Sequence, residues 1–224
     1  GTVRWTDDLK QQQPVTLEQV DLVVRNPGRQ HLLRLDATPE GGLAGRISMQ
    51  GVFRSPFLTL HPGKLSDWRG TAYVNMPEVD LAKMASPTHL TDQLGLKVSH
   101  GQGALRLWLD MNAGQLTGST ADLALTDVNA QFRQSAQPMQ LNHFSGRVSL
   151  AHKPNGWEIQ TERLAFATAH GTRWTQGNLR ALYQPTQAPQ QAPGELDISH
   201  IDLAALQELA SALPLPGGMQ HWIG

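Results

Sequence analysis

The sequence contains no cysteine and no long apolar run. The lack of cysteine excludes disulfides, thiolate nucleophiles and cysteine-ligated zinc sites. No run of about 18 apolar residues occurs, so we predict no membrane-spanning helix within these 224 residues. No signal peptide opens the chain. Because it starts in strand-like sequence and stops abruptly after a proline-rich joint, we expect a segment of a longer protein, with any anchor or export signal elsewhere.

The sequence also lacks an excess of basic residues. Its 18 lysines and arginines are balanced by 19 aspartates and glutamates, which gives a formal net charge of -1. A general nucleic-acid-binding protein needs a clustered excess of positive charge, so we predict no nucleic-acid partner. The overall charge also gives no electrostatic reason to bind anionic lipid headgroups.

The usual signatures of catalysis and metal binding are missing. The nine histidines include no pair at i, i+4 spacing and no HxH or HExxH motif, so we interpret them as surface or loop residues. No serine stands in a G-x-S-x-G elbow. Gly101-Gln102-Gly103 has only two glycines and precedes a strand, which indicates a turn rather than a phosphate-binding loop. We therefore predict no catalytic residue, no metal site, no cofactor and no enzymatic activity.

What the sequence does contain is alternation, most clearly between Ala104 and Phe132. Apolar residues fall on every second position from 105 to 111, and Asn112-Ala113-Gly114 can then turn the chain. The alternation resumes at 121, is interrupted at Thr126-Asp127, and continues to 132. A period of two is typical of strands with one buried and one solvated face, so this region is predicted to be an antiparallel meander.

Similar patterns predict strands through most of the chain. A hairpin is expected over 17–37 around Asn26-Pro27-Gly28, and another turn at Asn155-Gly156. Residues 184–194 are a Pro/Gln-rich loop. Further strands are expected at 3–5, 47–53, 72–76, 139–141, 144–150, 157–159, 164–168, 179–183 and 196–198.

Two short helices interrupt this pattern, near 80–94 and 202–213. Each begins at an aspartate that can cap a helix, Asp80 or Asp202, and both aspartates are followed by Leu-Ala. The two sites share the order strand, aspartate, helix. This repeated pattern predicts internal repeat units at about 1–86 and 95–213, although Asp-Leu-Ala is also a common helix start. Stacked sheet units of this kind form elongated bodies.

The residues alone do not decide what covers the apolar face of the predicted sheet. A second sheet would give a closed sandwich, that is, a structural or adhesive module. A curled open sheet would instead have its apolar lining covered by lipid chains. A third hypothesis is a sugar-binding protein that uses its six tryptophans, but no convincing pair of carboxylates across a cleft supports it.

Five stretches resemble the central region of the large AsmA-like proteins of the YhdP type, found in Gram-negative bacteria. The resemblance lies in the order of strands, turns and aspartate-led helices over nearly the full length, rather than in a catalytic fingerprint. The matching stretches are LEQVDLVVRNPGRQHLLRLDATP (17–39), WRGTAYVNMPEVDLAKM (68–84), GQGALRLWLDMNAGQLTGSTADLALTDVNAQF (101–132), ERLAFATAHGTRWTQGNLRALY (162–183) and GELDISHIDLAALQELASALPLP (194–216).

The resemblance implies a mainly β fold: an elongated, curled antiparallel sheet that forms an open groove, with residues 1–224 as one segment of it. It further implies a periplasmic portion of an inner-membrane-anchored protein, with the anchor outside this segment. Such a protein carries phospholipid along the groove between the inner and outer membranes. It would contact both membranes through parts of the protein outside this segment. Its partners would be phospholipid acyl chains, and the residues expected to line the groove are Leu105, Leu107, Leu109, Leu123, Leu125, Val128, Phe132, Val148 and Leu150.

Overall fold

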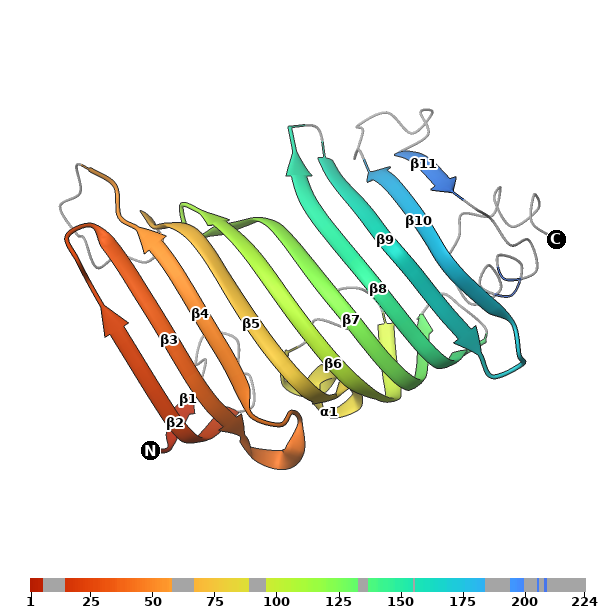
Figure 1. The fold of residues 1–224 in the computed structure, drawn as a ribbon, viewed down its shortest axis with the longest axis horizontal. Coiled ribbons are helices and arrows are strands. Elements are labelled where there is room, and N and C mark those ends of the chain that lie inside the picture. Colours follow the sequence, from red (N-terminus) through yellow and green to blue (C-terminus); the bar gives the residue numbers. More distant parts are fainter. Residues whose placement is uncertain are drawn as a thin grey trace.

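The structure is one broad antiparallel β-sheet (Figure 1). It is a computed structural model, and it describes residues 1–5, 15–57, 67–88, 96–132, 137–154, 156–183, 194–199, 205 and 208. The strands are β1 (Val3–Trp5), β2 (Val15–Arg25), β3 (Gln30–Pro39), β4 (Ile47–Arg54), β5 (Arg69–Asp80), β6 (Leu96–Asn112), β7 (Gln115–Phe132), β8 (Met139–Lys153), β9 (Gly156–Thr168), β10 (Arg173–Tyr183) and β11 (Gly194–Ser199).

The spatial order of the 11 strands is their order in the sequence. Each strand pairs with the strands before and after it in the chain, and β1 and β11 lie at opposite ends of the sheet (Figure 1). The sheet is therefore not closed. The predicted fold class, mainly β with an elongated open antiparallel sheet, is confirmed.

One short helix packs at one edge of the sheet. Helix α1 (Leu81–Thr88) follows β5 directly, and Leu81 and Met84 pack against the cluster of buried apolar residues. A Cβ atom added to Gly101 of β6 would lie 2.8 Å from Leu81 Cδ1, so glycine lets the helix approach this strand closely. A single 3-10 turn, η1 (Glu40–Gly42), connects β3 to β4 at the same edge. We call this edge the helix edge and the opposite one the upper edge.

Most register shifts between the described strands lie toward the helix edge, and one, between Asp110 and Met111 of β6, lies near the upper edge. Four contain a non-glycine residue with positive φ: Gln19 (49°), Asp127 (51°), Arg163 (53°) and Gln176 (62°). Another is the register shift between Met76 and Val79 in β5. A bulge bends its strand and increases the local twist. The bulges gathered toward the helix edge therefore curl this side of the sheet, and the strands curve there in Figure 1.

Three local predictions were wrong. Gly101-Gln102-Gly103 lies inside β6 and is not a turn, because the bulged register places both glycines against neighbouring groups. Residues 139–141 and 144–150 form one strand, because a bulge after Leu141 keeps the ladder continuous. Gly156 is not part of the predicted turn, since it begins β9 and pairs with Lys153, and Asn155 lies outside the described residues.

The helix predictions fall only partly on described residues. The first helix starts after Asp80 as expected and is described to Thr88, while 89–94 lie outside the described residues. Of the second, only Ala205 and Glu208 are described, and both are helical. Residues 184–193 of the Pro/Gln-rich stretch also lie outside the described part, and Gly194 begins β11.

Candidate functional site

The candidate site is the apolar face of the sheet, which the strand register makes continuous. Residues directly opposite each other on paired strands project to the same side. Following the register from strand to strand gives a single row with one residue from every strand between β2 and β11. This central row is Leu22, Leu35, Met49, Val74, Leu107, Ala121, Val148, Thr161, Leu179 and Ile198.

A second row runs beside the central row, two residues closer to the upper edge. Its only polar side chain is Ser119, and glycine or alanine occupies three positions. The second row is Val24, Leu33, Gly51, Ala72, Leu109, Ser119, Leu150, Ile159 and Ala181. At roughly 4.8 Å between strands, the central row extends for roughly 43 Å across the sheet.

The opposite face carries the charge, which shows that the two faces are chemically distinct. Arg147 forms two hydrogen bonds to Asp122 on the neighbouring strand, at 2.6 and 2.9 Å. These hydrogen bonds lower the pKa of Asp122 and raise the pKa of Arg147. Asp36 accepts from Ser48 (2.6 Å) and Arg34 (2.9 Å), and these bonds lower its pKa. These charges are therefore paired with one another, within β3 and between β7 and β8.

Burial on the apolar face is graded from one edge to the other. Toward the helix edge, α1 and Ala205 help to bury side chains such as Leu125 (7% exposed) and Phe166 (3%). In the central row no side chain is buried: Leu22 is 56% exposed and the others are half-buried. No large side chain in the described residues is fully buried. Among the described residues, the apolar face is thus covered along the helix edge and open over both rows.

Most of the residues predicted to line a groove share this face. Leu107 and Val148 stand in the central row, and Leu109 and Leu150 in the second row. Leu105, Leu125 and Val128 belong to the buried cluster toward the helix edge, and Leu123 packs against it. Phe132 ends β7, but its side chain lies outside the described part.

Sequence reasoning missed the parts of this face that lie outside β6–β8. The central row continues into Leu35, Met49 and Val74 on one side and into Leu179 and Ile198 on the other. The same alternation was visible in those strands. The pairing order was the missing information, since only the sequential order of the sheet joins the separate apolar faces into one row.

Comparison with known proteins identifies the family. The family described as YhdP protein matches residues 1–224, which is the whole chain. The chain belongs to the YhdP family. A search of curated proteins and a search of solved structures found no match. Membership places the chain among the AsmA-like proteins, a group generally associated with lipid transport, which are proteins of the cell envelope.

The described tryptophans of this YhdP-family chain do not form a single platform. Trp68 stacks on His31 at 3.8 Å, whereas Trp108 contacts Tyr73, Trp157 contacts His152 and Trp174 contacts Phe166. The pairs involve different strands. Among the described residues, the tryptophans thus make separate packing contacts rather than a shared sugar-stacking surface.

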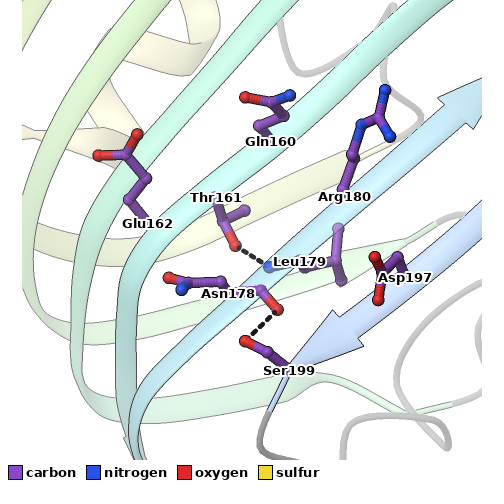
Figure 2. A pocket seen from close by; sticks show the side chains of 8 residues that line it. All are labelled: Gln160, Thr161, Glu162, Asn178, Leu179, Arg180, Asp197 and Ser199. Atoms are coloured by element: carbon purple, nitrogen blue, oxygen red, sulfur yellow. Dashed lines mark hydrogen bonds between the residues drawn. The ribbon is translucent and has the colours of Figure 1, made fainter.

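A pocket of about 240 Å³ lies between β9, β10 and β11 (Figure 2). Here the central row of the YhdP-family sheet meets its one polar side chain, Thr161. The Leu179 backbone N–H donates to Thr161 Oγ1 at 2.9 Å, and Ser199 Oγ donates to the Asn178 carbonyl at 3.4 Å. The Thr161 hydroxyl is therefore partnered within the protein, which lowers the cost of placing it beside apolar groups.

Neither a metal site nor a membrane-spanning helix is found in the part of the YhdP-family chain that the structure describes. No three His, Asp or Glu side chains there gather in a way that could hold a metal ion. No helix there is long and apolar enough to cross a membrane.

Proposed function

We propose that this segment conducts phospholipid along the open apolar face of its sheet, with the acyl chains lying on the central and second rows. In this role the segment is a non-enzymatic, periplasmic part of an inner-membrane-anchored protein that carries phospholipid between the inner and outer membranes. Transport of this kind would support the barrier function of the outer membrane. Family membership supports the lipid class of the cargo.

The observation that carries the proposal is the central row, which has one polar side chain and over which no described element packs. An exposed apolar stripe of this length is unfavourable in water, at roughly 25 cal/mol per Å² of apolar surface. Monomeric soluble proteins rarely leave such large contiguous apolar patches exposed unless the patch binds something. Acyl chains would cover this stripe, and each buried CH₂ group contributes about 0.8 kcal/mol.

The central row also offers a moving lipid a series of similar apolar contacts. A lipid that moves along it exchanges one apolar contact for the next, so no position holds it strongly. The polar interruptions are small: Thr161 is hydrogen-bonded to the backbone and Ser119 is short. No charged side chain stands in either row. The track therefore lacks the desolvation barrier that a charge would create.

Photo-crosslinking at neighbouring residues tests the proposal directly. Val148 stands in the central row, and Ser149, the next residue of β8, projects to the polar face. A photo-reactive phenylalanine analogue would replace Val148 or Ser149 in the full protein in cells, followed by mass spectrometry of the crosslinked species. We expect lipid adducts at position 148 and few at position 149. Equal adducts at both positions, or none at 148, would contradict lipid passage along this face.

A further inference from the structure

Although the net charge of the chain is -1, positive charge gathers at one place on the upper edge. Strand β2 ends at Arg25, β4 ends at Arg54 and β5 begins at Arg69, while Arg29 lies in the β2–β3 turn. All four side chains are exposed. The edge next to the second row therefore carries four arginines over β2–β5, with Asp67 just before β5 as an acidic neighbour.

Two of these arginines stand in an unfavourable arrangement. Arg54 and Arg69 are directly opposite partners on β4 and β5, so their Cβ atoms are expected about 4.5–5.5 Å apart. Like charges at such positions destabilise a sheet. Neither guanidinium forms an ion pair with any residue that the structure describes. The pair thus lacks the carboxylate that compensates Arg147 or Arg180 elsewhere on the polar face.

Arg54 and Arg69 line a pocket of about 550 Å³ that is suited to an anion. Thr71 and Asn112 add a hydroxyl and an amide to the same lining, and both can donate hydrogen bonds. Asp110 also lines the pocket and opposes anion binding. The charge of the lining remains positive by one unit, because two guanidinium groups face one carboxylate.

The other side of the same edge is aromatic. His31 and Phe53 are opposite partners on the apolar face, and Trp68 stacks on His31 at 3.8 Å and lies 6.1 Å from Phe53. Below them lie Leu33 and Ala72 of the second row. From the second row to the upper edge, the surface is first aliphatic and then aromatic, and at the edge it becomes cationic. A phospholipid has the same sequence of chemistry, from acyl chain through glycerol ester to phosphate.

We propose that Arg54 and Arg69 bind a phosphate group, supplied by the headgroup of a phospholipid whose acyl chains lie on the adjoining second row. The inference rests on the proposed lipid-conducting function, which it extends from the acyl chains to the headgroup. Guanidinium groups suit this role because they donate paired, charge-assisted hydrogen bonds to phosphate oxygens. The site selects lipids that carry phosphate over neutral lipids.

Lipid loading of the full protein tests the site. Wild type and the Arg54→Gln/Arg69→Gln double variant would be incubated with vesicles containing equal amounts of phosphatidylglycerol and diacylglycerol, and bound lipid quantified by mass spectrometry. We expect wild type to bind more phosphatidylglycerol than diacylglycerol. In the double variant the ratio of bound phosphatidylglycerol to bound diacylglycerol should fall about tenfold, while the amount of bound diacylglycerol stays the same. Arg106→Gln removes one positive charge from an exposed position on the polar face of β6, away from the edge, and should change nothing.

A calorimetric titration with inorganic phosphate separates the two sources of the anion. If phosphate binds wild type and not the double variant, but lipid preference is the same in both, the site takes free phosphate and the headgroup assignment is overturned. If both proteins load both lipids equally and neither binds phosphate, the site is refuted while lipid binding by the apolar face stands. If wild type loads neither lipid, the lipid-conducting function fails, and phosphate titration alone decides the site.

Asp110→Asn provides an independent check on the same pocket. Removal of the carboxylate leaves two arginines with no opposing charge in the lining, so phosphate binding and phospholipid preference should both increase. An unchanged or weaker response would contradict the placement of the anion in this pocket.

Discussion

At the scale of single residues, the most consequential charge is Glu158. Its side chain is only 5% exposed and lies 2.8 Å from Lys153 Nζ and 2.6 Å from Arg180 Nε. The hydrogen bonds from Lys153 and Arg180 lower the pKa of Glu158 from 4.5 to about 2. Because the pKa is lower in the folded state, Glu158 stabilises the fold above about pH 4.5, and this contribution is lost as the pH falls toward 2.

Unfolding titrations in denaturant at several pH values measure this effect. Glu158→Gln should be less stable than wild type at pH 7, and the difference should shrink between about pH 4.5 and pH 2. Arg4→Gln, an exposed arginine on β1 at the far end of the sheet from Glu158, is the control. A difference that is constant over this pH range would show that Glu158 acts through its shape rather than its charge.

Gly103 occupies a position in β6 that has no room for a side chain. Its φ is +154°, and an added Cβ would lie 2.1 Å from the Ala124 carbonyl oxygen on β7. Gly103→Ala should therefore destabilise the fold by about 1–3 kcal/mol, measured by chemical unfolding. Gly118→Ala is the matched control, since its nearest neighbour is the mobile end of Asp110 at 3.1 Å. A loss at Gly103 no larger than that at Gly118 would be evidence against this close contact.

Residue-level predictions succeeded where they depended on the alternation of apolar and polar residues along a single strand. The interruption at Thr126-Asp127 is a bulge in the structure, with Asp127 at a φ of 51°. The burial of Glu158 could not be predicted, because its partner Arg180 lies 22 residues away and is brought near only by the β9–β10 register. Alternation shows which residues share a face, but it does not show which charges meet on it.

At the scale of elements, α1 depends on its first turn. Asp80 precedes the helix, and its Oδ1 accepts a hydrogen bond of 3.1 Å from the Lys83 backbone N–H. This bond is the first cause of the lowered pKa of Asp80. Asp80→Ala should cost about 1 kcal/mol of stability, and Asp80→Asn much less, because asparagine also caps helices. The comparison is made by thermal unfolding at pH 7, and equal losses for both variants would exclude a capping role.

Loss of the cap also has a spatial consequence, since α1 covers the buried end of the apolar face through Leu81 and Met84. Hydrogen exchange should report it as faster exchange in α1 and the adjoining part of β6, with β9 and β10 unchanged. Uniform acceleration over all strands would instead mean that the helix and the whole sheet unfold as one unit.

Element positions were predictable to different degrees for identifiable reasons. The turn at Asn26-Pro27-Gly28 and the helix start at Asp80 were predicted because their residue types restrict the backbone locally. The extension of β6 back to Leu96 was missed, since glycines at 101 and 103 interrupt the apolar pattern and are accommodated only by bulged pairing with β7. Bulges are properties of two strands together, so a single strand's sequence does not fully specify them.

At the scale of the whole molecule, a conducting row and a binding site make different predictions. If lipid passes along the central row, a charge at any strand should block it, because transport in series stops at one barrier. Met49→Asp, Leu107→Asp and Leu179→Asp should each abolish lipid transport in cells by the full protein while circular dichroism is unchanged. Gln50→Asp, on the exposed polar face one residue from Met49, should transport normally.

Two results would contradict this view. If only one of the three variants failed, lipid would be held at a single site. If all three unfolded, the face would be a closed core, as in the sandwich alternative. The sequence could not decide between open and closed because alternation is the same in both. That distinction is visible only in the strand order, in which β1 and β11 never meet, and in the half-buried state of Leu107 and Val148.

The strictly sequential strand order has one more consequence, for how such a molecule is made. Because every strand pairs with its nearest neighbours in the chain, each new hairpin can add to an edge that already exists. Contacts that are short-range in sequence carry a low loop-closure cost and favour rapid folding. The sheet can thus form strand by strand from the N-terminus while later strands are still being synthesised. Strands added at the end of such a chain would extend the sheet without changing the pairing of the earlier strands.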